Sequence, residues 1–161
     1  MRSHTPITAY VALGSNLGDR QANLSAALLR IKATEGISVL AVSGSIETPS
    51  VGGPKDAPPF LNAAARLEVS IGSHALLHAM LDIEQSLGRV RRDKWEPRLI
   101  DLDVLLYGDQ IISSQELVVP HPLMHERRFV LQPLAEIAPH VVHPVLQMSI
   151  AGLLENLSSG V

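Results

Sequence analysis

Two aspartates and a cluster of basic residues lie side by side in the middle of this sequence, in a pattern that suits metal and phosphate binding. Asp101 and Asp103 stand within the apolar run LIDLDVLL, directly after the basic residues. Side chains of an extended strand alternate faces and each residue advances about 3.3 Å, so both aspartates share one face with Cα atoms about 6 to 7 Å apart. The basic residues are Arg89, Arg91, Arg92, Lys94 and Arg98. Four aliphatic residues are expected on the other, buried face: Ile100, Leu102, Val104 and Leu106.

Such a carboxylate pair fits Mg²⁺, which binds one or two protein carboxylates and completes its octahedron with water and phosphate oxygens. The turn Gly14-Ser15-Asn16 lacks the GK[ST] ending of a P-loop, so phosphates would be held by side chains and metal. Arginine guanidinium groups bind phosphate oxygens bidentately. Two other interpretations stay open: a solvated edge strand carrying the aspartates, and a basic surface loop that contacts RNA.

A second candidate group lies in the stretch HPLMHERRF, residues 121–129. His121 and His125 are four residues apart, a spacing that places two metal ligands on one helix face, but Pro122 puts His121 before the start of any helix. We interpret His121 as a phosphate contact, with Arg127 reaching the same anion. The alternative is a turn histidine without a ligand.

Composition predicts one domain spanning residues 1–161, large enough to bury a core. The chain is 46% hydrophobic and 18% charged, has no cysteine, and carries a formal net charge of −3. These values exclude a disulfide framework and a zinc-thiolate site, and they argue against bulk nucleic-acid binding. No secretory signal is recognisable at MRSHTPIT and no apolar run approaches the length of a membrane span, so we expect a cytoplasmic protein with no membrane contact.

The elements that must position these residues follow the order βαββαβ, the ferredoxin-like pattern of an α+β sandwich. Strands are expected at residues 8–13, 37–48, 60–69 and 100–106, and helices at 19–34 and from an N-cap at Ser73 to Gly88. The Gly14-Ser15-Asn16 turn should end the first strand. A long loop rich in proline and glycine spans residues 48–59. The remainder is expected to be a C-terminal appendage of short strands at 110–112 and 117–119, a turn, and a helix at 148–157.

The strand at residues 60–69 has a face with binding character. Its alternation puts Leu61, Ala63, Ala65, Leu67 and Val69 in the core. Phe60 and Asn62 then lie together on the other face, where an aromatic ring and an amide are available to a ligand.

Five segments of the chain resemble the 6-hydroxymethyl-7,8-dihydropterin pyrophosphokinase family of folate biosynthesis. They are ALGSNLGDR, ETPSVGG followed by FLNAA, IEQSLGRVR, KWEPRLIDLDVL, and VPHPLMHERRFVLQPLAEIAP. The resemblance covers nearly the whole chain. It implies a ferredoxin-like fold and the transfer of diphosphate from ATP to the hydroxymethyl oxygen of the pterin, with release of AMP.

The resemblance also implies roles for individual residues. Asp101 and Asp103 would bind two magnesium ions and, with Arg89 and Arg98, form the catalytic group. Contacts to ATP would come from Glu84, Arg91, Lys94, Trp95, His121 and Arg127. Contacts to the pterin would come from Thr48, Pro49, Val51, Asn62, Phe60 and Phe129, with the two phenylalanines sandwiching the ring. The partners implied are ATP and the pterin, and the protein is expected to be a monomer.

Four positions depart from the family pattern: Glu96 stands where glycine is usual, Glu116 where relatives can be basic, Leu81 where they can carry glutamine, and Phe60 in place of tyrosine. Two competing functions remain open from the residues alone. One is a metal-dependent phosphohydrolase that uses the same aspartates, and the other is a non-catalytic nucleotide-binding module. A serine hydrolase is unsupported because the sequence has no GxSxG motif.

Overall fold

The protein is described by a computed structural model that covers residues 5–48, 59–88 and 100–159. Its strands are β1 (Ile7–Ser15), β2 (Ile37–Val42), β3 (Ile46–Thr48), β4 (Phe60–Val69), β5 (Asp101–Tyr107), β6 (Ile112–Ser113) and β7 (Val118–Val119). Its helices are α1 (Arg20–Lys32), α2 (Ser73–Ser86), a 3₁₀ turn η1 (Met124–Glu126), α3 (Arg128–Ile137) and α4 (Ile150–Ser159).

The main sheet has the order β2-β4-β1-β5, with β3 continuing β2 along the same edge of β4, and every pairing is antiparallel. With β2 and β3 counted as one interrupted strand, the order along the chain is βαββαβ, as predicted. The α+β, ferredoxin-like fold is therefore confirmed.

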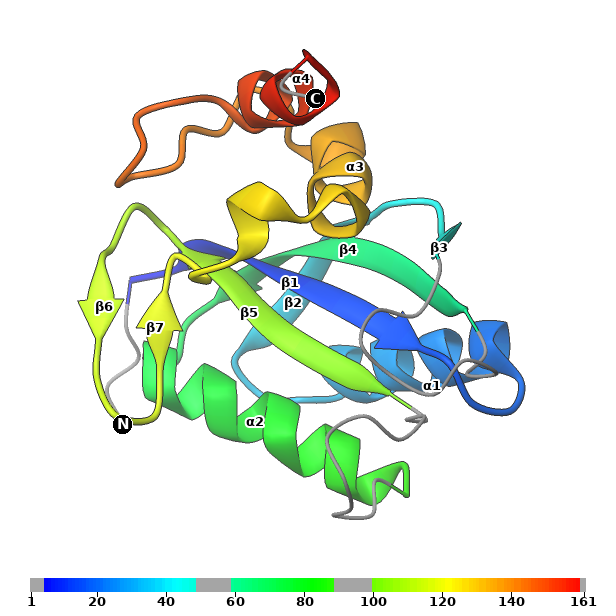
Figure 1. Ribbon diagram of the computed structural model, residues 1–161. Coiled ribbons are helices and arrows are strands. Elements are labelled where there is room, and N and C mark those ends of the chain that lie inside the picture. The colour runs from blue at the N-terminus through cyan, green and yellow to red at the C-terminus, as the bar shows by residue number, and fades with distance from the viewer. Residues whose placement is uncertain (1–4, 49–58, 89–99, 160–161) are drawn as a thin grey trace.

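The sheet is the middle of three layers, as Figure 1 shows: α1 and α2 cover one face, and α3 and α4 lie over the other. The first core lies between the sheet and the α1 and α2 helices and includes Leu13, Ile31, Leu67 and Met80. The second core lies under α3 and α4 and includes Tyr10, Leu131 and Ile150. The alternation of β4 is confirmed, because Ala63, Ala65, Leu67 and Val69 all belong to the first core.

The helix α3 was not expected from the sequence, which predicted a turn over residues 121–129 and no helix between that turn and residue 148. Pro133 falls inside the helix, although proline disfavours a helix interior. Val130, Leu131 and Leu134 nevertheless recur at helical spacing and are buried against the second face of the sheet. Two contacts hold the helix there: Arg66 donates a hydrogen bond to the Ile137 carbonyl, and the Gly44 amide donates to Glu136 Oε1 at 2.8 Å. The C-terminal region is thus the third layer of the sandwich.

Some boundary predictions were wrong. Gly14 and Ser15 stay within β1, and Asp19 caps α1 by accepting a hydrogen bond from the Ala22 amide at 3.1 Å. Gly72, not Ser73, is the N-cap of α2.

Leu106 lies on the opposite face from the predicted one. The pairing of β1 with β5 shifts register between Tyr10 and Val11, which puts Leu105 and Leu106 together in the second core. This bulge returns Tyr107 to the first core and leaves the alternation of residues 100–104 unchanged.

In the described part of the chain, no helix has the length and apolarity that a bilayer crossing requires.

Candidate functional site

The two aspartates lie on β5 as the alternation predicts. Leu102 and Val104 point into the first core, so Asp101 and Asp103 take the other face of the strand. Asp101 is half-buried and Asp103 is exposed. β5 is an edge strand of the sheet, so both carboxylates stand where a ligand can reach them from outside.

A cavity of about 290 Å³ opens along the outer edge of β5, and we call it the edge cavity. Its apolar wall consists of Leu77 and Leu81 from α2 with Leu117 and Val118 from the β6–β7 region. Its carboxylates are Glu84, Asp101, Asp103 and Glu116, and His121 completes the polar lining. None of the described residues that line it is a lysine or arginine. An anionic ligand in this cavity therefore requires a metal ion or cations from elsewhere in the chain.

Glu84 borders the edge cavity and links α2 to β5. The side chain comes from α2, the residue is only 3% exposed, and Oε2 accepts a hydrogen bond from the Leu102 amide at 2.7 Å. That amide lies on the edge of β5 that carries no further strand of the main sheet. Glu84 thereby satisfies a strand-edge donor and fixes the helix against the aspartate strand.

His121 is positioned as a hydrogen-bond donor beside the aspartates. Its amide donates to the Leu105 carbonyl at 3.0 Å, and its Nδ1 accepts from the Leu123 amide at 3.2 Å. The neutral ring therefore carries its proton on Nε2. Burial lowers the pKa of His121, the nearby Asp103 carboxylate opposes that shift, and Arg127 adds to it. The ring is thus kept neutral near pH 7 while one N–H remains suited to a phosphate oxygen.

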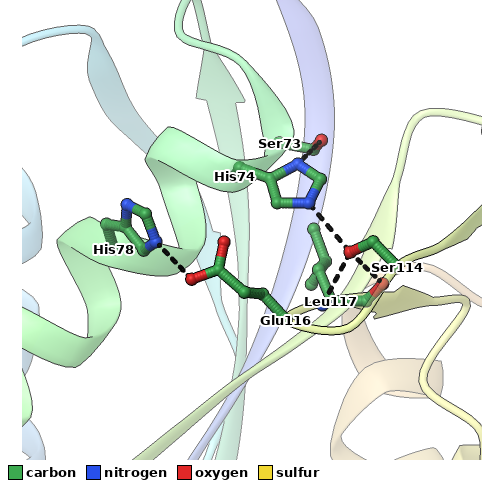
Figure 2. A network of polar contacts seen from close by, with 6 residues as sticks. All are labelled: Ser73, His74, His78, Ser114, Glu116 and Leu117. Atoms are coloured by element: carbon green, nitrogen blue, oxygen red, sulfur yellow. Dashed lines mark hydrogen bonds and ion pairs between the residues drawn. The ribbon is translucent and has the colours of Figure 1, made fainter.

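The outer wall of the edge cavity is tied to α2 by two histidines (Figure 2). His74 Nε2 lies 2.9 Å from Ser114 Oγ, and His78 Nε2 lies 3.2 Å from Glu116 Oε2. Ser114 Oγ also accepts from the Leu117 amide at 3.0 Å and donates to the Leu117 carbonyl at 3.1 Å. These contacts hold Leu117 against the helix. Sequence reasoning assigned His74 and His78 no role, because their partners lie about 40 residues away along the chain.

A second group of predicted residues meets two strands away, on the same face of the sheet as the aspartates, at what we call the Asn62 face. β3 pairs with β4 so that Thr48 lies opposite Phe60. The Asn62 amide nitrogen donates to Thr48 Oγ1 at 2.7 Å, and Asn62 itself is only 7% exposed. The hydrogen bond fixes the orientation of the Asn62 amide, which leaves its carbonyl oxygen with a defined direction.

Phe129 and Arg127 lie at the start of α3, which packs over β4 on this same side of the sheet. The Arg127 guanidinium carbon is 5.6 Å from the centroid of the Phe129 ring, a cation–π geometry. Phe129 also packs against the second core. Arg127 therefore connects the Asn62 face with His121 at the edge cavity.

Gly14 joins the two regions and was not singled out as a site residue. Its cross-strand partners are Asn62 on β4 and Asp101 on β5, so the three residues form one row across the sheet. A Cβ atom at Gly14 would lie 3.1 Å from Asn62 Oδ1 and 3.5 Å from Phe60 Cδ1. Glycine within a strand often marks such a close approach, but the sequence prediction placed Gly14 in a turn after the strand and so missed this signal.

The carboxylates fit a hard divalent cation in part. Asp101 and Asp103 offer oxygen ligands on one strand face, the chemistry that Mg²⁺ prefers. Among the described residues, no three acidic, histidine or cysteine side chains form a complete metal-binding group. A metal held here would draw its remaining ligands from water and phosphate, which suits Mg²⁺ bound with a nucleotide.

Several predicted site residues lie outside the described part of the chain. They are Pro49, Val51, Arg89, Arg91, Lys94, Trp95 and Arg98. Nine others are described, and they fall into the two regions above: Glu84, Asp101, Asp103, His121 and Arg127 near the edge cavity, and Thr48, Phe60, Asn62 and Phe129 at the Asn62 face.

Comparisons with known proteins match most of the chain. A family model described as 7,8-dihydro-6-hydroxymethylpterin-pyrophosphokinase matches residues 10–139. The chain is 48% identical to the 2-amino-4-hydroxy-6-hydroxymethyldihydropteridine pyrophosphokinase of Methylorubrum extorquens, over 83% of this chain and 84% of the relative. It is 44% identical to the protein of the same name from Bacillus subtilis, over 83% of this chain and 79% of that relative.

Among solved structures, the chain is similar to wild-type HPPK-DHPS of Plasmodium falciparum crystallised with pterin and p-hydroxybenzoate. The TM-score is 0.77 at 15% identity, over 99% of this chain and 44% of that chain. This chain thus spans less than half the length of that solved protein, and the likeness shows the fold.

Proposed function

This chain belongs to the 7,8-dihydro-6-hydroxymethylpterin-pyrophosphokinase family, and from that premise we propose how its residues divide the reaction. The enzyme transfers diphosphate from ATP to the hydroxymethyl group of 6-hydroxymethyl-7,8-dihydropterin, giving AMP and the pterin diphosphate in folate biosynthesis. The division of roles rests on the row Asn62–Gly14–Asp101 across three neighbouring strands. With strands about 4.8 Å apart, Asn62 and Asp101 are separated by about 10 Å, room for the reacting groups between them.

The Asn62 face receives the pterin. The Asn62 amide, oriented by Thr48, hydrogen-bonds the ring edge, since a buried amide with one fixed partner selects a complementary donor and acceptor pattern. Phe60 and Phe129 stack on the two faces of the ring. Pro49 and Val51 complete the pocket wall in this proposal.

The edge cavity receives ATP. Its apolar wall takes the base, and its carboxylate end, with His121 and Arg127, takes the triphosphate. Glu84 supports this end through its hydrogen bond to the Leu102 amide. Arg91, Lys94 and Trp95 add contacts to the nucleotide in this proposal.

Asp101 and Asp103 would hold the magnesium, and we propose two ions bound together with ATP. Held by these two carboxylates, the metal would supply positive charge to the triphosphate, which would lower the barrier to attack by an oxygen nucleophile. The lining of the edge cavity supports this assignment, because its described carboxylates would otherwise repel the triphosphate.

The chemical step is an in-line displacement at the β-phosphorus. The hydroxymethyl oxygen of the pterin forms a bond to that phosphorus as the bond to the oxygen bridging the α- and β-phosphates breaks. AMP leaves with the electron pair, and the hydroxyl proton passes to solvent or phosphate. Catalysis comes from positioning and charge stabilisation, to which His121 contributes a neutral N–H and Arg89 and Arg98 contribute positive charge.

The remaining assignments are also proposals. We infer a single pyrophosphokinase domain across residues 1–161, a monomer, and a cytoplasmic location. The length of the chain supports a single domain, and the absence of cysteine is compatible with a cytoplasmic location.

The test is incubation of the pure protein with Mg²⁺ and ATP, with and without 6-hydroxymethyl-7,8-dihydropterin. We expect AMP and pterin diphosphate to form in equal amounts and only when the pterin is present. Equal ATP hydrolysis in both reactions would favour a phosphohydrolase. Nucleotide binding without turnover would favour a binding module.

A further inference from the structure

Arg20, the first residue of α1, links three segments of the chain beside the Asn62 face. Its Nη2 donates to Glu47 Oε2 at 2.6 Å, and its Nη1 donates to the Pro59 carbonyl at 2.8 Å. Glu47 lies in β3, and Pro59 directly precedes β4. The side chain of Arg20 is 27% exposed, so it is largely enclosed by these contacts.

Both contacts of Arg20 lie one residue from a pterin-contact position. Glu47 precedes Thr48, and Pro59 precedes Phe60, the residue that pairs with Thr48 across the two strands. Thr48 in turn accepts the hydrogen bond that orients Asn62. The position of the Arg20 guanidinium therefore bears on three of the four described residues of the Asn62 face.

β3 needs such a link because it is short. It has three residues and pairs with β4 alone, so few main-chain hydrogen bonds hold it in register. α1 supplies a second connection nearby, where Ser45 Oγ donates to Gln21 Oε1 at 3.1 Å. The Asp19 cap fixes the start of α1, so Arg20 and Gln21 contact their partners from a well-ordered helix end.

The two contacts suit arginine in particular. A planar guanidinium presents several N–H groups in a rigid fork, so one group can bind a carboxylate while another binds a carbonyl oxygen. A lysine ammonium can pair with Glu47 but does not fix both partners in one geometry. Because Glu47 is 56% exposed, the ion pair adds little to global stability, and its effect should be local.

We propose that Arg20 is a positioning residue for the pterin, acting through Glu47 and Pro59 on Thr48, Phe60 and Asn62. This inference rests on the proposed assignment of the Asn62 face to the pterin. Arg20 touches neither substrate in this proposal, and its loss changes pterin binding while the edge cavity keeps its nucleotide affinity.

The experiment compares R20A, R20K and the control R30A with the wild type. Arg30 is an exposed arginine in the last turn of the same helix. Binding of 6-hydroxymethylpterin is measured by calorimetry with Mg²⁺ and a non-hydrolysable ATP analogue present, and binding of the analogue is measured alone. Steady-state kinetics separate KM for the pterin from kcat, and a melting curve checks folding.

For R20A we expect the pterin Kd and KM to rise about tenfold, the value of one or two lost charge-assisted hydrogen bonds. The analogue Kd should stay within about twofold of the wild type, because the described partners of Arg20, Glu47 and Pro59, do not line the edge cavity. R20K should lie between R20A and the wild type, and R30A should match the wild type.

Two outcomes would overturn the proposal: a pterin Kd for R20A within twofold of the wild type, or an equal rise in the pterin and analogue Kd values. If R20A does not fold, E47Q provides the same test, since it keeps the shape of the acceptor and removes its charge. A wild type that fails to bind the pterin would instead count against the proposed function, so the two failures are distinguishable.

Discussion

The edge cavity and the Asn62 face lie at opposite ends of one row of residues, yet they are built in different ways. The edge cavity lies beyond the last strand of the sheet, between α2 and the β6–β7 region, and its described polar groups are four carboxylates and one histidine. The Asn62 face lies on the sheet itself, and its described polar groups are an amide and a hydroxyl. The edge cavity suits a ligand that binds together with cations, and the Asn62 face suits a neutral ring with hydrogen-bonding edges.

This difference separates two kinds of recognition. If the edge cavity takes ATP as proposed, affinity there should depend on charge balance, because its four carboxylates, of which Glu84 is buried and Asp101 half-buried, repel a triphosphate unless metal and arginine compensate. At the Asn62 face, affinity depends on the placement of a single amide and of aromatic rings. Substitutions should therefore affect one substrate far more than the other, except at Gly14, where the two regions meet.

The largest effect is expected for D101A. If Asp101 binds the metal as proposed, its loss should lower kcat by about 10³ or more, because metal charge stabilisation is worth several kcal/mol in the transition state. Pterin affinity should stay within about threefold of the wild type, since Asp101 lies two strands away from Asn62. The measurements are AMP formation at saturating substrates and pterin calorimetry.

The matched control for D101A is D109A, which removes an exposed carboxylate from the turn after β5 and should leave both quantities unchanged. Activity retained in D101A would remove the metal role from this strand. Loss of both activity and pterin affinity in D101A would show that substitutions in one region also change binding at the other.

An intermediate effect is expected for G14A, which tests the point where the regions meet. The added Cβ would stand 3.1 Å from Asn62 Oδ1, closer than most side-chain contacts, so the amide must move. We expect the pterin Kd to rise about tenfold and the free energy of unfolding to fall by about 1 to 3 kcal/mol, the usual cost of overpacking. Calorimetry and chemical denaturation measure the two quantities.

G44A serves as the control for G14A, because its Cβ would meet Glu136 Oε1 at an ordinary distance of 3.5 Å away from both regions. A G14A variant that binds pterin as the wild type does would show that the close approach of β1 to Asn62 has no role in recognition.

Much of the fold and of the site could be predicted from local pattern. The alternation of residues 60–69 and 100–104 placed Phe60, Asn62, Asp101 and Asp103 on the correct faces, because strand periodicity acts residue by residue. It failed at Leu106, where a bulge depends on the pairing with β1 and leaves no mark in the periodicity of β5 alone.

Other features could not be predicted because they depend on contacts between distant segments. α3 was not predicted. Pro133 disfavours a helix locally, and the helix is stabilised instead by the burial of its apolar residues on the sheet. The links from His74 to Ser114 and from Arg20 to Glu47 and Pro59 join residues 27 to 40 positions apart. No spacing rule within one element indicates such pairs.

A smaller effect is expected for S114A, which weakens the outer wall of the edge cavity. Ser114 Oγ holds both main-chain polar groups of Leu117 and contacts His74 (Figure 2). Loss of these hydrogen bonds should raise KM for ATP about three- to tenfold, from roughly 0.5 to 1.5 kcal/mol of lost interaction, with the pterin Kd unchanged. S113A, one residue earlier in β6, is the control, and an unchanged KM in S114A would exclude Ser114 as a support of the nucleotide wall.

The smallest effect on activity is expected for H143N, which tests whether stability can change with pH outside both regions. Burial lowers the pKa of His143, and the neighbouring His125 adds to the shift. His143 Nδ1 accepts hydrogen bonds from the Val145 and Leu146 amides at 3.2 and 3.1 Å, an arrangement that the asparagine carbonyl can imitate.

As pH falls through 6.5, the ordinary value, the unfolded chain takes up a proton at His143 while the folded protein resists it. The free energy of unfolding should therefore fall with decreasing pH and level off below the lowered pKa of the folded state. H143N should flatten this dependence in denaturation curves between pH 7.5 and about 5 and keep kcat and both substrate affinities within about twofold.

H121N should also flatten the pH dependence of the free energy of unfolding, because the pKa of His121 is lowered too. It should in addition weaken ATP binding, since His121 lines the edge cavity. Equal effects of the two variants on ATP binding would mean that His121 contributes to folding alone.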